Sequence, residues 1–140
     1  QADFWRLLVL QKHGGIYLDI DAHFVWPLGA IIKPDYDELY VTTKRGDISN
    51  YFIASKSDNP HLEQMINLIL NNIKENSLKN VYDLTGPGVF NHVLDNTKVN
   101  TTLYRYTCNQ GNFTNEYFQY IDKPEGKWTK AQKEIDIVKK

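Results

Sequence analysis

The spacing of hydrophobic residues changes from helical to alternating within the first 21 positions. Apolar residues between Ala2 and Lys12 recur three or four positions apart, which predicts a helix, and Gly14 and Gly15 then supply a stop that permits positive φ. The next six residues, IYLDID, alternate: the apolar positions are Ile16, Leu18 and Ile20, and the polar positions are Tyr17, Asp19 and Asp21. This pattern predicts a strand over 16–21 with one dry face and one face that carries chemistry.

The same patterns predict alternating helices and strands along the rest of the chain. Strands are expected over 39–43, 50–55, 102–108 and 117–122, and helices over 60–73, 89–94 and 128–140. The helix at 60 has Asn59 as its N-cap, Pro60 in its first turn and one apolar stripe, formed by Leu62, Met65, Ile66, Ile69 and Ile73. This order of elements favours an α/β layered domain.

Composition narrows the class of protein and of partner. The chain has 140 residues and a formal net charge of -1, so one domain over 1–140 is expected, without an electrostatic footprint for nucleic acid or an anionic membrane. No apolar run approaches the roughly 18 residues that a membrane span needs. The single Cys108 excludes an internal disulfide and is expected to be a small buried residue of a strand. The four histidines lack the spacing of a zinc site and are expected to be structural or exposed.

The two aspartates of IYLDID are the main candidates for chemistry. Residues two apart on a strand point the same way, so Asp19 and Asp21 would aim at one region, and paired carboxylates favour Mg²⁺ or Mn²⁺ with open positions for a diphosphate. The same sequence pattern would also arise from two acids that lie at an exposed strand end and bind nothing. Asp3 and Arg6 stand at i,i+3 on the preceding helix, a spacing that is also ordinary for a surface salt bridge. The glycine turn would fold that helix back beside the aspartates.

The run ADFWRLLVLQKHGGIYLDID, residues 2–21, resembles the sugar-binding region with a DxD motif in a superfamily of retaining glycosyltransferases. Its members include yeast-type initiating α-1,6-mannosyltransferases, bacterial capsule and lipooligosaccharide transferases and, more distantly, clostridial glucosylating toxins. The shared pattern is A-x-D-x-x-R, an apolar helix, G-G-x-Y and D-x-D, with its core over 2–28. The resemblance implies a GT-A fold, a Rossmann-like mixed sheet with flanking helices. It also implies an earlier βαβ portion that the chain lacks, so 1–140 is expected to be a partial catalytic domain.

The resemblance also assigns roles to individual residues. It implies that Asp3 and Arg6 contact the sugar and diphosphate of a UDP- or GDP-sugar, that Asp19 contacts sugar or ribose hydroxyls, and that Asp21 binds the metal, Mn²⁺ or Mg²⁺, beside Asp19. Arg6 and Asp21 would be the catalytic residues, and Tyr17 would serve packing. Further residues match more weakly: Asn50 beside the transferred sugar, Gly86 and Pro87 on the acceptor side, and Glu125 and Trp128 as closing residues. Asn50 is equally a turn residue, and TGPG equally a tight turn.

The expected function is therefore metal-dependent transfer of a sugar from a nucleotide sugar to a hydroxyl of a glycan, lipid-linked or protein acceptor, with retention implied by the resemblance. One alternative is a non-catalytic module that binds a sugar or nucleotide sugar. Another is a DxD aspartyl phosphatase, although Ala22 and His23 replace the small pair that usually follows its motif. A composition rich in Asn, Lys, Ile and Tyr favours an AT-rich bacterial source and its cytoplasm, with the Golgi lumen as the eukaryotic alternative.

Overall fold

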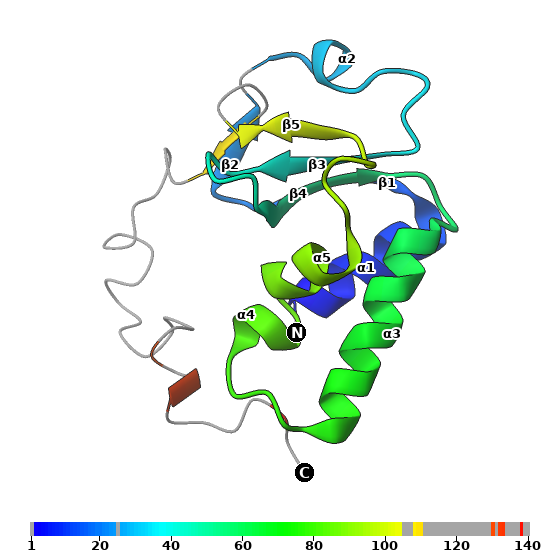
Figure 1. Ribbon diagram of the computed structural model, residues 1–140. Coiled ribbons are helices and arrows are strands. Elements are labelled where there is room, and N and C mark those ends of the chain that lie inside the picture. Colours follow the sequence, from blue (N-terminus) through cyan, green and yellow to red (C-terminus); the bar gives the residue numbers. More distant parts are fainter. Residues whose placement is uncertain are drawn as a thin grey trace.

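The computed structural model describes residues 2–24, 26–104, 108–110, 130, 132–133 and 138. In these residues a four-stranded mixed sheet separates a layer of helices from a smaller layer that contains a two-stranded ribbon (Figure 1). The predicted α/β fold with a mixed sheet is confirmed. The predicted strand over 117–122 and most of the predicted helix over 128–140 lie outside the described residues.

The sheet is centred on two long strands. Its order is β1 (Gly15–Leu18), β4 (Ile48–Ser55), β3 (Glu38–Thr42) and β5 (Thr101–Leu103). β1 and β3 pair antiparallel with β4, and β5 pairs parallel with β3. The ribbon pairs β2 (Ala22–Phe24) with β6 (Cys108–Gln110), so the prediction of a single strand over 102–108 is wrong. Periodicity could not reveal that β5 and β6 belong to different sheets.

Most helices cover one face of the sheet. These are α1 (Ala2–His13), α3 (Pro60–Glu75), α4 (Val81–Leu84) and α5 (Pro87–Val93), whereas α2 (Leu28–Ile31) lies on the other side (Figure 1). The predicted cap of α3 is confirmed, since the Asn59 side chain accepts a hydrogen bond from the backbone N–H of His61. α2 and α4 are not evident in the sequence, because four residues are too few to show a helical spacing.

Alternate residues of the central strands pack into two separate cores. On the helical side, Tyr40 and Ile53 pack with residues of α1, α3 and α5, and the Tyr40 ring meets Phe90 edge to face at 6.2 Å. On the other side, Leu39 and Phe52 pack with residues of β2 and α2. β4 is buried along almost its whole length, as expected for a strand that is covered on both faces.

A buried polar cluster ties the start of α3 to the sheet. Glu38 accepts hydrogen bonds from the Tyr40 hydroxyl and from the Asn59 side chain, at 2.7 and 2.8 Å. His61 Nδ1 lies 2.7 Å from the other Glu38 oxygen. His61 thus has a structural role, as the sequence analysis expected.

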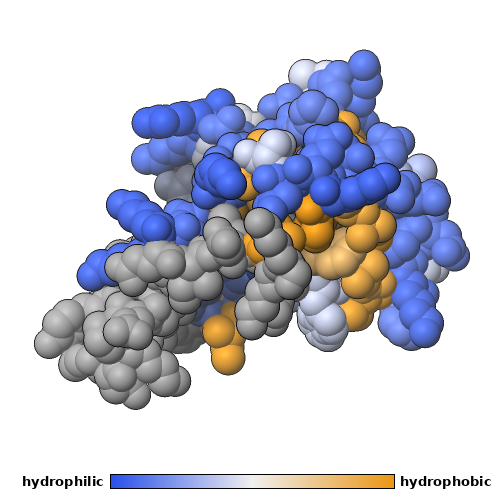
Figure 2. All heavy atoms as spheres, turned by 90° about the horizontal axis from the view of Figure 1, so that it is seen from below, coloured by the Kyte–Doolittle hydropathy of each residue, from blue (hydrophilic) through white to orange (hydrophobic). Residues whose placement is uncertain are grey.

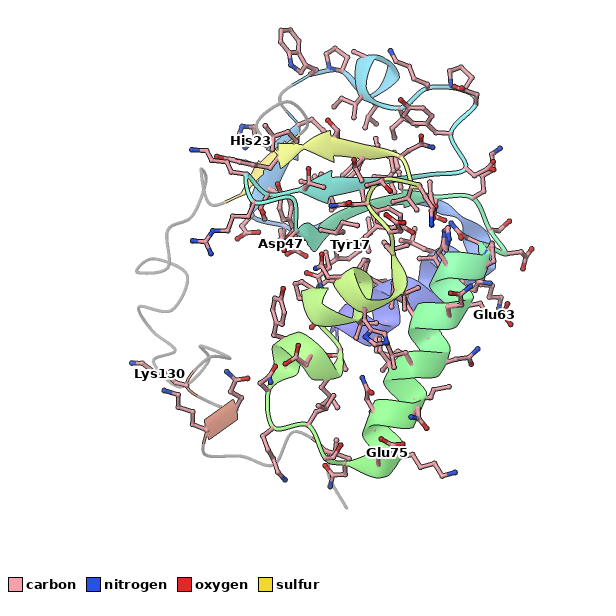
Figure 3. The ribbon with its side chains drawn as sticks, viewed as in Figure 1. Tyr17, His23, Asp47, Glu63, Glu75 and Lys130 are labelled. Atoms are coloured by element: carbon pink, nitrogen blue, oxygen red, sulfur yellow. The ribbon has the colours of Figure 1, made fainter. Side chains whose placement is uncertain are left out.

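The surface of the helical layer is mixed in character. Viewed from this side, apolar side chains gather in one part of a mostly hydrophilic face (Figure 2), and exposed Leu8 and Leu70 belong to α1 and α3. Glu63 and Glu75 point outward from the two ends of α3, whereas Tyr17 points from β1 toward the helices (Figure 3). No helix in the described part of the chain is long and apolar enough to cross a membrane.

Candidate functional site

The two motif aspartates lie on a turn between β1 and β2, residues 19–21, which we call the D-x-D turn. The prediction of a strand through Asp21 is therefore wrong. Pairing of β1 with β4 ends at Leu18, and the backbone N–H of Asp19 then donates to the Tyr51 carbonyl at 2.9 Å. The chain turns at once, because the N–H of Ala22 donates to the carbonyl of Asp19.

The apolar face predicted for this segment is also wrong in part. Ile20, between the two aspartates, is 97% exposed, and Ile16 is 42% exposed. The arrangement of the aspartates therefore follows from the turn and not from the alternation of the sequence.

The glycines that end α1 let the chain reverse, so that α1 packs beside the sheet near this turn. Gly14 has φ +64°, and a Cβ at this position would lie 2.8 Å from the backbone nitrogen of Ser57, which follows β4. Glycine therefore permits both the left-handed backbone and the close approach of the two chain segments. As the sequence analysis expected, Asp3 and Arg6 are thereby brought to the strands.

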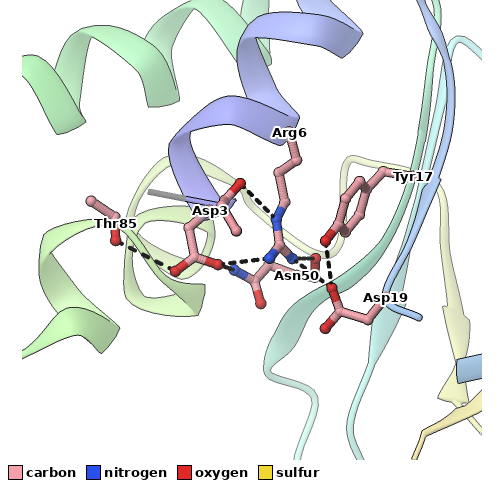
Figure 4. Close-up of polar contacts among 7 residues, drawn as sticks. Asp3, Arg6, Tyr17, Asp19, Asn50 and Thr85 are labelled. Carbon is pink, nitrogen blue, oxygen red and sulfur yellow. Dashed lines mark hydrogen bonds and ion pairs between the residues drawn. The ribbon is translucent and has the colours of Figure 1, made fainter. Parts of the chain in front are cut away.

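Arg6 is the centre of the site. Its side chain is buried, with the residue 5% exposed, and each nitrogen of its guanidinium contacts a protein oxygen. Nη2 lies 3.0 Å from Asp3 Oδ1, and Nη1 lies 3.3 Å from Asp19 Oδ1 (Figure 4). Nη1 also donates to the backbone carbonyl of Asn50 on β4. The pair of Asp3 and Arg6 is therefore no ordinary surface salt bridge, because Arg6 connects α1 to the D-x-D turn and to β4.

Asp3 and Asn50 complete the contact between helix and sheet. The Asn50 side-chain amide donates to Asp3 Oδ1 at 2.9 Å, so it has a tertiary role beyond that of a turn residue. The Thr85 hydroxyl approaches Asp3 Oδ2 at 3.5 Å from the corner between α4 and α5. Asp3 is thus held by Arg6 of its own helix and by residues from two distant parts of the chain.

Tyr17 is a member of the site that the sequence analysis assigned to packing. Its hydroxyl donates to Asp19 Oδ1 at 2.7 Å, and its ring lies under the Arg6 guanidinium, 4.2 Å from the ring centroid to Cζ. Stacking on an aromatic face is a favourable arrangement for arginine. We call the group around Arg6 the Arg6 cluster; its members are Asp3, Arg6, Tyr17, Asp19, Asn50 and Thr85.

Burial and charge perturb the titration of two members of the Arg6 cluster. Burial is the main cause that raises the pKa of the Asp19 carboxyl, and the negative charges of Asp21 and Asp3 act in the same direction. The hydrogen bond from Tyr17 and the charge of Arg6 oppose this rise in pKa. Burial, together with the hydrogen bond to Asp19, raises the pKa of Tyr17 to about 12, so the phenol stays protonated and donates. A cation beside Asp19 would stabilise its ionised form.

The remaining predicted site residues are placed less closely or lie outside the described residues. Asp21 lies on the D-x-D turn, near enough for its charge to act on Asp19. Gly86 and Pro87 directly follow Thr85, with Gly86 as the N-cap of α5 and Pro87 in its first turn. Glu125 and Trp128 lie outside the described residues. Thr85 opens the TGPG turn, but no sequence signal pointed to its contact with Asp3, which stands 82 positions earlier.

The carboxylates of Asp19 and Asp21 suit a divalent cation whose remaining coordination positions are filled by other ligands. The described residues contain no group of three or more His, Cys, Asp or Glu side chains able to hold a metal ion by themselves. Carboxylates such as Asp19 and Asp21 are hard oxygen donors, and Mg²⁺ or Mn²⁺ is often bound by one or two carboxylates plus substrate phosphates. The residues present therefore fit such an ion, with waters or a phosphate ligand in its remaining positions.

This chain is related to the glycosyltransferases with a DxD sugar-binding region, in keeping with its mixed sheet, its helix with Asp3 and Arg6, and its D-x-D turn. Residues 1–39 match the model of that family, described as glycosyltransferase sugar-binding region containing DXD motif. A toxin of Photorhabdus asymbiotica subsp. asymbiotica is 31% identical over 118 residues, which is 74% of this chain and 4% of the toxin.

A solved structure gives the same relation. The structure of PaToxG glycosyltransferase is 34% identical and superposes with a TM-score of 0.58, over 66% of this chain and 33% of that chain. The chain thus spans about a third of the solved relative and a small part of the toxin.

Proposed function

We propose that this chain forms the sugar- and metal-binding part of a metal-dependent glycosyltransferase. The reaction would move a sugar from a UDP- or GDP-sugar to a hydroxyl acceptor with retention of anomeric configuration. The observation that carries the proposal is the convergence of Asp3, Arg6, Asp19 and Asn50 from α1, the D-x-D turn and β4. The relation to DxD glycosyltransferases supports the same class.

The charge of the site supports a requirement for a cation. One guanidinium stands against the carboxylates of Asp3 and Asp19, and Asp21 adds a further negative charge nearby. Such a site repels a diphosphate, and the nearly neutral chain supplies no overall attractive field. Asp19 and Asp21 would hold Mn²⁺ or Mg²⁺, which when bound offsets the charge of the diphosphate leaving group.

Arg6 and Tyr17 would act by holding the carboxylates in place. Arg6 is buried and contacts both Asp3 and Asp19, and Tyr17 fixes Arg6 from one side while it donates to Asp19. Side chains that are already held in place lose less conformational entropy when a sugar binds. Asp3, Asp19 and Asn50 would then present polar groups to sugar or ribose hydroxyls. Direct contact of Arg6 with the diphosphate, as the resemblance implies, stays a prediction.

A titration with metal and donor tests the proposal. Mn²⁺ and a panel of UDP-glucose, UDP-N-acetylglucosamine and GDP-mannose are titrated into the protein by calorimetry, with Asp21→Asn beside the matched control Asp35→Asn. Asp35 is an exposed acid of the segment between α2 and β3. We expect binding of one donor that requires Mn²⁺, is lost in Asp21→Asn and survives in Asp35→Asn. Donor binding that needs no metal would overturn the role of Asp21.

Activity measurements separate the remaining alternatives. Release of nucleoside diphosphate in the presence of a hydroxyl acceptor supports the transferase, and the anomeric proton of the product in an NMR spectrum reports retention or inversion. Sugar binding without any need for a nucleotide would indicate the non-catalytic module. Hydrolysis of p-nitrophenyl phosphate that depends on Asp19 would indicate the phosphatase.

A further inference from the structure

Thr85 joins the corner between α4 and α5 to the candidate donor site. The residue is 8% exposed, and its backbone N–H donates to the Val81 carbonyl at 3.1 Å, which ends α4. Its hydroxyl is directed at Asp3 Oδ2, at 3.5 Å (Figure 4). A buried hydroxyl that reaches a carboxylate on a distant helix brings together parts of the chain that no local pattern connects.

The two oxygens of Asp3 have different partners. Oδ1 receives both Arg6 Nη2, at 3.0 Å, and the Asn50 amide, at 2.9 Å. Oδ2 receives the hydroxyl of Thr85. The torsion of a terminal carboxylate is broad, so the two donors at Oδ1 restrict its rotation about the bond to Cβ but leave a range of angles open. A partner at the second oxygen narrows that range further.

The corner that carries Thr85 is tightly packed. A Cβ at Gly86 would lie 3.0 Å from the backbone of Tyr82, and Pro87 then begins α5. The Asn72 side chain of α3 donates to the carbonyl of Leu84. The position of the Thr85 hydroxyl is therefore set by packing of the helical layer rather than by a mobile loop.

We propose that Thr85 is a positioning residue that orients the Asp3 carboxylate for contact with a hydroxyl of the donor sugar. The inference rests on the proposed function, because it gives Asp3 a sugar to contact. Gly86 and Pro87 directly follow Thr85, so a shift of this corner also shifts the group that orients Asp3. Thr85 acts through Asp3 and does not contribute a ligand to the metal.

The test compares three variants at threonine positions. Thr85→Val keeps the shape of the side chain and removes the hydroxyl, Thr85→Ser keeps the hydroxyl, and Thr42→Val makes the same change at a hydroxyl that donates to the Thr102 carbonyl within the sheet. Calorimetry measures the affinity for Mn²⁺ alone and for the nucleotide sugar that the wild type binds with Mn²⁺. We expect Thr85→Val to weaken donor binding about threefold to tenfold; the upper figure corresponds to loss of one hydrogen bond to a charged group, and the 3.5 Å contact is longer than such a bond. Its Mn²⁺ affinity should stay unchanged, and Thr85→Ser should restore donor binding.

A second readout needs no ligand and separates this inference from the proposed function. The side-chain amide of Asn50 donates to Asp3, so its signals in a ¹H–¹⁵N NMR spectrum report the position of that carboxylate. These signals should move in Thr85→Val and return in Thr85→Ser, with no change in Thr42→Val. Unmoved signals would overturn the inference whether or not a donor binds. If the signals move and the wild type binds no nucleotide sugar with Mn²⁺, the orientation of Asp3 by Thr85 stands and the proposed function fails. Equal donor affinity in Thr85→Val and wild type would overturn the role in donor binding.

Discussion

Removal of the Arg6 guanidinium should destabilise the fold in a manner that depends on pH. Arg6→Met keeps an unbranched apolar stem and deletes the cation, which leaves Asp3 and Asp19 close together and partly buried. The Arg6 side chain is 6% exposed, and the carboxylate side chains are 21% and 24% exposed. Loss of one partner from a buried ion pair costs about 3 to 5 kcal/mol. The remaining solvation of both carboxylates places the expected loss at about 3 kcal/mol, the low end of this range.

The sign of the pH dependence follows from Asp19. Its pKa in the folded protein already lies above the ordinary value, because burial disfavours the anion, and Arg6 opposes that rise. Without Arg6 the folded-state pKa of Asp19 rises further, whereas that of the unfolded chain stays ordinary. The folded variant then binds a proton that the unfolded chain releases, so its stability increases as pH falls. The destabilisation relative to wild type should be smaller at pH 5 than at pH 7.

Urea unfolding followed by tryptophan fluorescence at the two pH values measures both effects. Lys56→Met is the matched control, because it removes the cation of a pair with Asp37 in which both side chains are mostly exposed. An exposed pair of this kind contributes at most about 1 kcal/mol, so the control should lose little stability. The reasoning would be refuted if Arg6→Met lost no more than Lys56→Met, or if its loss were equal at both pH values.

Two further variants test the turn and its neighbour. Tyr17→Phe keeps the ring under Arg6 and deletes the hydrogen bond to Asp19; since that bond lowers the pKa of Asp19, protons should compete with Mn²⁺ at higher pH. Calorimetric Mn²⁺ titrations across pH 4 to 7 would show this shift, and an unchanged profile would exclude the contribution of the hydroxyl. Ile20→Ser should change the free energy of unfolding by no more than about 0.5 kcal/mol, because the side chain is 97% exposed. A loss above about 1.5 kcal/mol in urea unfolding would instead support a buried apolar face for this segment.

Local patterns predicted the elements whose boundaries depend on neighbouring residues. α3 was predicted because Asn59, Pro60 and a stripe of apolar residues all act within a few positions of one another. The return of α1 was predicted because the glycines after it permit positive φ. The prediction of a strand over 16–21 was partly wrong, since alternation describes the faces of a strand but cannot show that its pairing with β4 ends at Leu18, opposite Phe52.

The sequence by itself determined the α/β class and brought Asp3, Arg6, Asp19 and Asp21 forward as candidates, because helical spacing, glycine turns and the D-x-D pattern are local. The resemblance to the DxD glycosyltransferases added Asn50. Only the tertiary structure decided that Arg6 is buried between two carboxylates, that Tyr17 stacks on it, and that Thr85 reaches Asp3. These contacts join residues from separate elements. Their partners are selected by packing and by the need to satisfy a buried charge, and neither is visible in the order of residues along the chain.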